Sequence, residues 1–385
     1  MDITIFPGRL QGTAAAIPSK SQAHRLLICA AFSKEQTVLH CPDTNRDIEA
    51  TADCLRALGA KILRTEDGYT VIPGKQLPEK ALLNCCESGS TLRFMLPIVG
   101  ALGVDATFQM EGRLPQRPLS PLWEELERMG CTLTRPTEST IRCCGKLRSG
   151  AYTIAGNVSS QFITGLLFAL ELMGGSTLTV TGKVESVPYI EMTKAALGLF
   201  PGFQSPGTVT VEGDWSNSAF FLAARVLGSD VQVTGLDEAS CQGDRAAADL
   251  LPALKDHCTI SAADIPDLVP ILAVVAAANQ GAVFTHIQRL RLKESDRVAS
   301  VIAMVEALGG KAEATEDSLT VYGTGLTGGT VQSCNDHRIA MAAAIAATVC
   351  THPVTILDAQ CVNKSYPHFW AEYRRLGGNY EQHLR

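Results

Sequence analysis

The sequence predicts an α/β fold assembled from repeated units. A helix rich in small residues, a turn and a β-branched strand follow one another six times along the 385-residue chain. A second unit, an amphipathic helix that closes on Leu-Gly or Met-Gly and leads into a strand and hairpin, alternates with the first. Self-similarity of this kind is typical of repeat architectures. We expect six units of the type βαβαββ, arranged as two halves of three units each.

The elements of the first unit occur in order at 28–43, 97–112, 170–182, 223–237, 274–290 and 345–360. In each segment a run of small apolar residues predicts the helix, and β-branched residues behind a turn predict the strand. The second unit occupies 54–74, 125–145 and 304–323. The equivalent strands are about 70 residues apart, except for two intervals of about 50 residues. The missing material falls at 197–211 and 250–267, where we expect two shortened units.

Composition and charge restrict the class of protein. Hydrophobic residues make up 46% of the chain, enough for two or three domain cores, and the formal net charge of -6 argues against a general nucleic-acid binder. The longest nearly apolar runs are too short to cross a bilayer, and the N-terminal residues lack the apolar region of a secretory signal. Thirteen cysteines without metal-ligand spacing indicate free thiols. We expect a cytoplasmic monomer that binds no nucleic acid, no membrane and no metal.

The start of one helix raises the first functional question. In "IPSKSQAHRLLICAAF", Lys20 and Arg25 lie at or near the beginning of an apolar helix, where the helix dipole disfavours cations. Ser19 or Ser21 can cap this helix. Two explanations are open at this point. The cations could be exposed with their stems along the helix, or a bound anion could be gathered by the helix end, the hydroxyls and both cations.

The same pattern recurs at the other small-residue helices. Their bodies are apolar on nearly all sides, so we expect them to be buried, yet their first turns are polar. The residues concerned are Ser88, Gly89, Ser90 and Arg93; Ser159, Ser160 and Gln161; Asp267; Asn335, Asp336, His337 and Arg338; and, on a more amphipathic helix, Lys293, Glu294 and Arg297. Capping explains the hydroxyls and the carboxylates, with Asp267, Asn335 and Asp336 as caps, but not the cations. Convergent helix starts with cations are suited to bind anions.

Two carboxylates accompany these cations. Four or more cations exceed what one phosphate needs, so we expect ligands with several negative charges or two anionic molecules. Asp267 and Glu294 would repel such ligands unless the carboxylates move protons. The pattern therefore favours catalysis over storage of an anion.

Nine short motifs, in a fixed order, make the chain similar to a known family. They are "PSKSQAHR" at 18–25, "ESGSTLR" at 87–93, "QRPLSPL" at 116–122, "NVSSQF" at 157–162, "SVPYIE" at 186–191, "IPD" at 265–267, "LKESDR" at 292–297, "NDHRIAM" at 335–341 and "NKSYPHF" at 363–369. Each motif is weak alone, but their common order is specific and extends over nearly the whole chain. The chain resembles the 3-phosphoshikimate 1-carboxyvinyltransferases, also called EPSP synthases.

The resemblance implies a two-domain, inside-out α/β barrel with buried helices and outer sheets. One domain would comprise residues 1–18 and 212–385 and the other residues 19–211, with the active site in the cleft between them. The implied reaction transfers the enolpyruvyl group of phosphoenolpyruvate to the 5-hydroxyl of shikimate 3-phosphate through a tetrahedral ketal and releases phosphate. It requires no cofactor.

The resemblance also implies a role for each matching residue. Contacts to shikimate 3-phosphate are expected from Ser21, Arg25, Ser159, Ser160, Ser186, Tyr189, Asp267 and Lys293. Contacts to phosphoenolpyruvate are expected from Lys20, Gly89, Arg93, Arg117, Gln161, Arg297, Arg338 and Lys364. Asp267 is the expected base for the hydroxyl, and Glu294 or Lys20 would protonate C3. Lys20, Lys364 and the arginines would hold the leaving phosphate.

Several of these residues also have simpler explanations. Gly89 could serve only a turn, Tyr189 could be a core aromatic residue, and Lys364 could be a surface lysine. Three positions depart from the pattern of the family: Glu87 stands in place of an asparagine, Val187 in place of a basic residue, and Arg289 in place of an asparagine.

Two rival functions are less consistent with the sequence. The related carboxyvinyltransferase that acts on UDP-N-acetylglucosamine typically has a cysteine in the loop near Arg117, and residues 111–123 contain none. A non-catalytic anion-binding protein would be indicated by the loss of Asp267, Glu294 or Lys20. All three residues are present.

Overall fold

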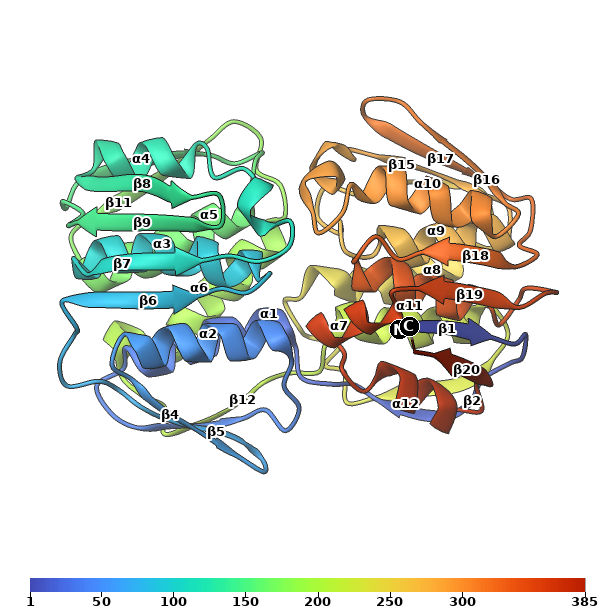
Figure 1. Ribbon diagram of the computed structural model, residues 1–385, viewed down its shortest axis with the longest axis horizontal. Helices are drawn as coiled ribbons and strands as arrows, with labels where there is room; N and C mark the ends of the chain where they lie inside the picture. Colours follow the sequence, from blue (N-terminus) through green and yellow to red (C-terminus); the bar gives the residue numbers. More distant parts are fainter. Residues whose placement is uncertain (385) are drawn as a thin grey trace. The chain divides into compact units, whose positions relative to one another are not determined.

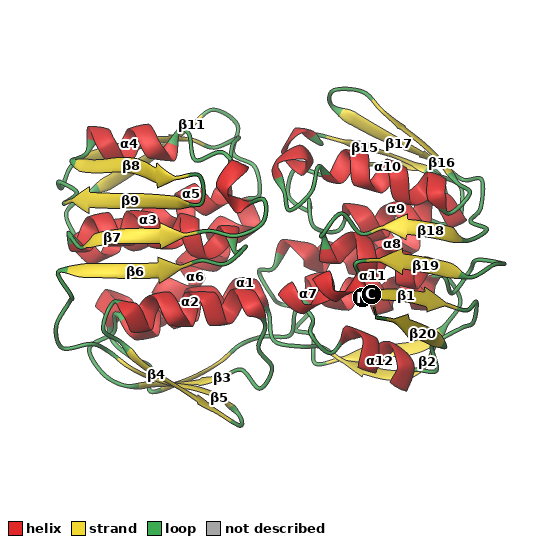
Figure 2. Cartoon of the chain, viewed as in Figure 1, coloured by secondary structure: helices red, strands yellow, loops and turns green. Residues whose placement is uncertain are grey.

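The computed structural model describes residues 1–384 and divides into two compact units. Pro18–Val211 form one unit, named here the inserted unit. Met1–Ile17 and the chain from Glu212 onward form the other, named the terminal unit. Each unit combines three sheets with buried helices among the described residues (Figure 2).

The three sheets of the inserted unit contain four, four and two strands. The first has the order β12 (Thr208–Thr210), β3 (Thr37–His40), β5 (Gly68–Ile72) and β4 (Lys61–Thr65). The second has the order β6 (Lys80–Asn84), β7 (Asp105–Gln109), β9 (Thr140–Gly145) and β8 (Cys131–Thr137). The third pairs β10 (Ala151–Ala155) with β11 (Thr177–Thr181).

The helices of the inserted unit pack against these sheets. They are α1 (Lys20–Ala31), α2 (Arg46–Ala57), α3 (Gly89–Leu102), α4 (Leu122–Arg128), α5 (Ser160–Met173) and α6 (Val187–Leu199), with the short 3-10 helices η1 (Leu114–Gln116) and η2 (Pro201–Phe203). Helix α3 packs against α5 and against strands β7 and β9, which lie over it in Figure 1. Nearly every residue of α3 is buried, because this helix is enclosed by other elements on all sides.

The terminal unit repeats this organisation. One sheet has the order β18 (Gly329–Gln332), β19 (Val354–Leu357), β1 (Asp2–Ile5) and β20 (Tyr380–His383). A second has the order β14 (Cys258–Ser261), β15 (Ala282–Thr285), β17 (Ser318–Tyr322) and β16 (Lys311–Ala314). The third pairs β13 (Asp230–Thr234) with β2 (Gln11–Ala15). Figure 1 shows β1 between β19 and β20, so the first and last strands of the chain share one sheet.

The helices of the terminal unit include the most completely buried ones. They are α7 (Trp215–Val226), α8 (Ala247–Ala253), α9 (Val269–Ala278), α10 (Arg297–Ala307), α11 (His337–Ala346) and α12 (Phe369–Arg375), with the 3-10 helices η3 (Gly243–Ala246), η4 (Gln288–Leu292) and η5 (Ala359–Lys364). All residues of α11 are buried. Strand β15, in contrast, alternates between buried and partly buried residues, so its sheet has one inner face and one outer face.

The six strands predicted from the repeat each belong to a different sheet. They are β3, β7, β11, β13, β15 and β19, and each pairs in parallel with one neighbour. Four of the six sheets add antiparallel strands to this parallel pair. The two sheets without them contain β11 and β13, the strands that precede the segments 197–211 and 250–267.

The helix starts differ from the predicted caps in three places. Asp336 alone is the N-cap residue of α11, so the prediction of Asn335 as a cap is wrong. Ser88, Ser159 and Asp336 cap their helices through side-chain hydrogen bonds. Asp267 does not cap α9, so that prediction is wrong: Leu268 is the N-cap residue, and the Asp267 carboxylate forms ion pairs instead. Ser19 is the N-cap residue of α1 but makes no side-chain capping hydrogen bond. Among residues 1–384, every helix falls short of the length and apolarity that a membrane crossing requires.

Candidate active site

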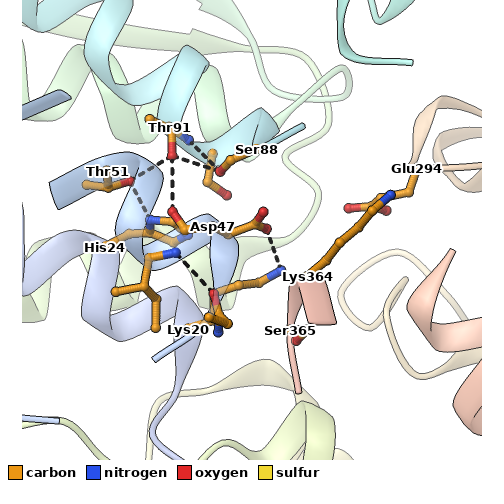
Figure 3. Close-up of polar contacts among 12 residues, drawn as sticks. Lys20, His24, Asp47, Thr51, Ser88, Thr91, Glu294, Lys364 and Ser365 are labelled. Carbon is orange, nitrogen blue, oxygen red and sulfur yellow. Dashed lines mark hydrogen bonds and ion pairs between the residues drawn. The ribbon is translucent and has the colours of Figure 1, made fainter. Parts of the chain in front are cut away.

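Helix α1 places Lys20 at the start of a buried helix of the inserted unit. Lys20 Nζ donates a hydrogen bond to Asp47 Oδ2 over 2.9 Å, and each of the two side chains is 15% exposed. Asp47 lies in the first turn of α2, which Asn45 caps. Figure 3 shows this pair next to the starts of the helices. A carboxylate from a neighbouring helix therefore compensates for the cation that the dipole of α1 disfavours.

Arg25, one turn further along α1, points into the unit. It is 2% exposed, so its interpretation as an exposed surface cation is wrong. Nε donates to Thr193 Oγ1 over 2.9 Å. The other guanidinium nitrogens donate to Ser21 O, Thr164 Oγ1 and Tyr189 O. These hydrogen bonds tie α1 to α5 and α6 and fix the position of Tyr189.

Helices α3 and α5 bring Arg93 and Gln161 together. Arg93 Nη1 donates to Gln161 Oε1 over 2.7 Å, and Nη2 donates to the carbonyl of Pro118 over 3.0 Å. Gln161 Nε2 in turn donates to Ser90 Oγ over 2.9 Å. A β-carbon on Gly165 of α5 would lie 2.3 Å from the carbonyl oxygen of Arg93, so a glycine is needed for this close approach of the two helices.

Gly89 opens α3 directly beside Arg117. A β-carbon on Gly89 would lie 2.4 Å from Nη1 of Arg117, which is 9% exposed. Gly89 is not among the residues with positive φ, so a turn does not explain it and that interpretation is wrong. The missing side chain makes room for a guanidinium at the start of a helix, an arrangement suited to bind an anion.

The starts of α5 and α6 supply hydroxyl groups. Ser159 caps α5 by accepting a hydrogen bond from Gln161 N over 3.3 Å, and Ser160 is the first helical residue. Ser186 precedes α6 with φ 54° and ψ 41°, a left-handed conformation that costs a non-glycine residue about 1–3 kcal/mol. Strain of this kind clusters at functional sites. Tyr189 follows in the first turn and is half-buried, so it is not an enclosed core residue.

In the terminal unit, three cations surround the Asp267 carboxylate. Its Oδ1 accepts from Arg297 Nη1 over 2.5 Å and lies 3.4 Å from Lys293 Nζ. Its Oδ2 lies 3.3 Å from Arg338 Nη2, and the Asp267 carbonyl accepts from Arg338 Nη1 over 3.2 Å. The Asp267 side chain is 19% exposed and that of Lys293 20%, whereas both arginines are buried. Two groups of this cluster thus remain accessible.

Two further carboxylates complete the cluster around Arg297. Nη2 of Arg297 donates to Glu294 Oε2 over 2.6 Å, and Nε donates to Asp336 Oδ2 over 2.8 Å. The cap of α11, Asp336, therefore also forms an ion pair. Lys293, Arg297 and Arg338 carry three positive charges, and Asp267, Glu294 and Asp336 carry three negative charges. We name these six residues the ionic cluster, and its formal charge is zero.

Burial and neighbouring charges change the acidity of the ionic cluster. Burial raises the pKa of Asp267, but Arg338, Lys293 and Arg297 lower it by more, so the pKa of this carboxyl lies well below its usual range. Burial lowers the pKa of Lys293 to about 8, although Asp267 acts in the opposite direction. The charge of Lys293 therefore changes close to neutral pH.

Lys364 is the last residue of the 3-10 helix η5 in the terminal unit. It is 6% exposed, and its Nζ donates to the carbonyl of Asn335 over 2.8 Å, so the interpretation as a surface lysine is wrong. Asn335 and the preceding Cys334 both have left-handed φ values of 55° and 53°. Next to Lys364, Ser365 Oγ accepts from Asn217 Nδ2 over 3.0 Å. The left-handed segment Cys334–Asn335 thus holds this lysine through the Asn335 carbonyl (Figure 3 labels Lys364 and Ser365).

Comparisons with known proteins identify the family. The sequence model of "EPSP synthase (3-phosphoshikimate 1-carboxyvinyltransferase)" matches residues 6–203 and 253–373. The chain belongs to the EPSP synthase family. It is 37% identical to a 3-phosphoshikimate 1-carboxyvinyltransferase of Clostridium kluyveri, over 99% of this chain and 98% of that protein. It is also 37% identical to the protein of that name from Clostridium acetobutylicum, over 98% and 97%.

Solved structures show the same fold at lower sequence identity. The EPSP synthase of Acinetobacter baumannii has a TM-score of 0.78 at 21% identity, covering 99% of this chain and 100% of that one. The enolpyruvyl transferase NikO of Streptomyces tendae has a TM-score of 0.71 at 17% identity, covering 99% and 98%. The mixed α/β architecture is therefore shared across these proteins of the EPSP synthase fold.

The residues predicted as ligands fall into groups within each unit. In the inserted unit, contacts join Gly89, Arg93, Arg117 and Gln161 into one group and Ser21, Arg25 and Tyr189 into another, with Lys20 held by Asp47. In the terminal unit, Asp267, Lys293, Glu294, Arg297 and Arg338 form the ionic cluster with Asp336, and Lys364 is bound to the Asn335 carbonyl.

Sequence analysis missed three acidic partners of these groups. Asp47 pairs with Lys20, Asp336 pairs with Arg297, and Asp244 of η3 is 4% exposed. Burial, with a further contribution from Asp267, raises the pKa of Asp244 to about 6. Asp47 and Asp336 stand at helix starts, where capping by itself accounts for a carboxylate. Nothing in their local sequence distinguishes a cap from an ion-pair partner.

Proposed function

We propose that this chain transfers the enolpyruvyl group of phosphoenolpyruvate to the 5-hydroxyl of shikimate 3-phosphate, giving 5-enolpyruvylshikimate 3-phosphate and phosphate. Membership of the EPSP synthase family supports this activity. The observation that connects this activity with particular residues is the ionic cluster. In it an accessible carboxylate, Asp267, lies among Lys293, Arg297 and Arg338. A site that only stored anions would gain nothing from a carboxylate at its centre.

The first step adds the 5-hydroxyl oxygen to C2 of phosphoenolpyruvate while C3 gains a proton. We propose Asp267 as the base that takes the hydroxyl proton, and Glu294 or Lys20 as the donor to C3. The pKa of Asp267 is low while three cations face it. Two phosphorylated substrates would offset those cations and raise its basicity when both are bound.

In the second step the tetrahedral ketal loses a proton from C3, and its bond to the phosphate oxygen breaks. We propose that Lys20, Lys364 and the arginines bind the departing phosphate. Arg117 lies against Gly89 at the start of α3, and Arg93 follows one turn along this helix, so both guanidinium groups stand near a helix start that favours anions. Positive charge placed at the developing phosphate stabilises the transition state more than the substrate.

We propose that shikimate 3-phosphate binds at the hydroxyl-rich helix starts. Ser21, Ser159, Ser160, Ser186 and Tyr189 would donate hydrogen bonds to it. Arg25 would act partly through Tyr189, because its guanidinium binds the Tyr189 carbonyl over 2.8 Å. Lys293 would contribute a positive charge that is lost above about pH 8.

We also propose the finer architecture that the sequence predicts. The six sheets, each with one parallel strand pair, would correspond to six βαβαββ-type repeats, two of them shortened, around buried helices in an inside-out α/β barrel. The two units would act as two domains that close on the substrates. A monomeric state and a cytoplasmic location also stay predictions.

Phosphate release by the purified protein tests the activity. Phosphoenolpyruvate should release phosphate only when shikimate 3-phosphate is present, and UDP-N-acetylglucosamine in its place should yield none. Absence of phosphate release with both substrates would refute the proposed function. Small-angle scattering without and with both ligands tests closure, and unchanged curves would argue against it.

A further inference from the structure

A chain of hydrogen bonds joins helices α1, α2 and α3 of the inserted unit near their starts. His24 Nδ1 lies 2.7 Å from Thr51 Oγ1, and Thr51 Oγ1 lies 2.7 Å from Thr91 Oγ1. Thr91 Oγ1 donates to Ser88 Oγ over 2.8 Å. His24, Thr51 and Thr91 are fully buried, and Ser88 is 1% exposed. Figure 3 shows the dashed chain crossing from α1 through α2 to the start of α3.

The number of available protons sets the direction of this chain. The Thr91 hydroxyl has one proton, and the 2.8 Å contact with Ser88 Oγ requires Thr91 as its donor. The 2.7 Å contact between Thr51 and Thr91 can form with either hydroxyl as the donor, and the Asp47 carbonyl lies 3.5 Å away, so the proton of Thr91 goes to Ser88. The Thr51 hydroxyl must then donate to Thr91, so it accepts from His24. The imidazole therefore carries its proton on Nδ1.

The surroundings of His24 keep its imidazole ring uncharged. The ring packs edge-on against Phe94 with centroids 6.2 Å apart, and among the described residues no group is hydrogen-bonded to Nε2. Burial lowers the pKa of His24 well below its usual value, and Lys20 and Arg25 lower it further. A neutral ring that donates through Nδ1 leaves only a lone pair unsatisfied, which costs less than an unsatisfied N–H group.

Each member of the chain stands one helical turn after a residue of the candidate active site. His24 is four residues after Lys20 on α1, and Thr51 is four residues after Asp47 on α2. Thr91 is three residues after Ser88, the cap that directly precedes Gly89. Residues three or four positions apart lie on the same face of a helix. The chain therefore joins the three helix starts directly beneath their functional residues.

We infer that His24, Thr51 and Thr91 are positioning residues, which fix the helix starts that carry Lys20, its partner Asp47, and Gly89, so that Lys20 and Gly89 meet the phosphate end of phosphoenolpyruvate together. The inference rests on the proposed role of Lys20 and Gly89 in binding that substrate. Without the hydroxyls, α1, α2 and α3 would still pack through their apolar residues. Their starts would no longer be locked in register, and small displacements at a phosphate site reduce its efficiency steeply.

Isosteric substitutions test the inference. Thr51→Val and Thr91→Val remove one hydroxyl each and keep the volume, whereas Thr51→Ser and Thr91→Ser retain the hydroxyl. Thr37→Val is the matched control, because Thr37, in strand β3 of the same unit, is also fully buried and its Oγ1 lies 2.7 Å from Ser205 Oγ in the segment before β12. For His24, Asn can donate from the position of Nδ1, and Leu cannot.

We expect the two valine variants to lower kcat/KM for phosphoenolpyruvate on the order of tenfold, mainly through KM. The serine variants and His24→Asn should recover most of this loss, and His24→Leu should not. Thr37→Val should lower the melting temperature about as much as Thr51→Val and Thr91→Val do. It should leave kcat/KM within about twofold of the value for the unmodified protein. These steady-state constants and the melting temperature are measured on the same preparations.

Two results separate the possible failures. If the unmodified protein releases no phosphate from the two substrates, the proposed function fails and the inference fails with it. If the unmodified protein is active but Thr51→Val and Thr91→Val behave as Thr37→Val does, the proposed function stands and the hydroxyl chain has only a structural role, which overturns the inference.

Discussion

Replacing Asp267 by asparagine separates its charge from its shape. Asparagine keeps the volume of the side chain and one oxygen that accepts from Arg297, but it cannot take a proton from a hydroxyl. The negative charge that Arg297, Arg338 and Lys293 face at 2.5, 3.3 and 3.4 Å disappears. The formal charge of the ionic cluster changes from zero to plus one.

The structure allows the size of both effects to be worked out. Breaking a buried ion pair costs about 3–5 kcal/mol. Because the Asp267 side chain is 19% exposed and asparagine retains a hydrogen bond, we expect a loss of unfolding free energy of about 2–3 kcal/mol. Loss of a general base lowers kcat by about a hundredfold or more. The extra positive charge favours anionic substrates, so their KM should not rise.

The pH dependence of stability tests independently whether the charge of Asp267 stabilises the folded protein. The pKa of Asp267 in the folded protein lies below the ordinary value of 3.8. A carboxyl with a lowered pKa contributes stability that is complete above its unfolded pKa and is lost as pH falls through its folded pKa. The difference in unfolding free energy between the unmodified protein and Asp267→Asn should therefore have its full size near pH 5 and shrink below about pH 4.

Steady-state phosphate release and urea unfolding measure these quantities. Glu125→Gln is the matched control: Glu125 is 7% exposed and pairs with Arg128 at 2.7 Å on helix α4, without contact to the ionic cluster. It should lower stability without the hundredfold loss of kcat. A kcat of Asp267→Asn within a fewfold of the unmodified protein would remove Asp267 from the role of base.

Three further predictions concern other groups. Gly89→Ala should raise KM for phosphoenolpyruvate by about tenfold or more, because a β-carbon 2.4 Å from Nη1 must displace Arg117; steady-state kinetics measure it. In the pH profile of kcat/KM for shikimate 3-phosphate, activity should fall above about pH 8 as Lys293 loses its charge, and Lys293→Arg should lack this fall. Asp244→Asn should stabilise the protein at pH 7.5 by about 2–3 kcal/mol in urea unfolding, because a buried carboxyl whose pKa is raised from 3.8 to about 6 destabilises the fold progressively between those pH values and fully above them.

Each of these predictions has an outcome that contradicts it. An unchanged KM in Gly89→Ala would mean that Arg117 takes no part in binding phosphoenolpyruvate. A fall above pH 8 that persists in Lys293→Arg would assign that titration to another group. Asp244→Asn should lose its advantage below about pH 4, where the unmodified carboxyl is protonated in both states, and a gain that does not depend on pH would show that its origin is not the charge.

The sequence by itself determined the elements and the chemical types at their ends. Runs of small apolar residues identified the buried helices α3, α9 and α11, and the repeat located six strands that each belong to a different sheet. These features follow from short-range periodicity, because the spacing of apolar residues within one segment decides which faces must be buried. The resemblance to the EPSP synthases rested on motifs at the same helix starts.

Only the tertiary structure decided which residues became partners. Lys20 pairs with Asp47 on the next helix, Arg297 with Asp336 thirty-nine residues away, and Arg25 turns inward to α5 and α6. Asp267 forms ion pairs where a cap had been predicted. A cap needs only its own helix, whereas an ion pair needs two elements that are brought together by packing. The charge state of Asp267 and Lys293 depends on the same long-range packing, since burial and neighbouring charges set their pKa values.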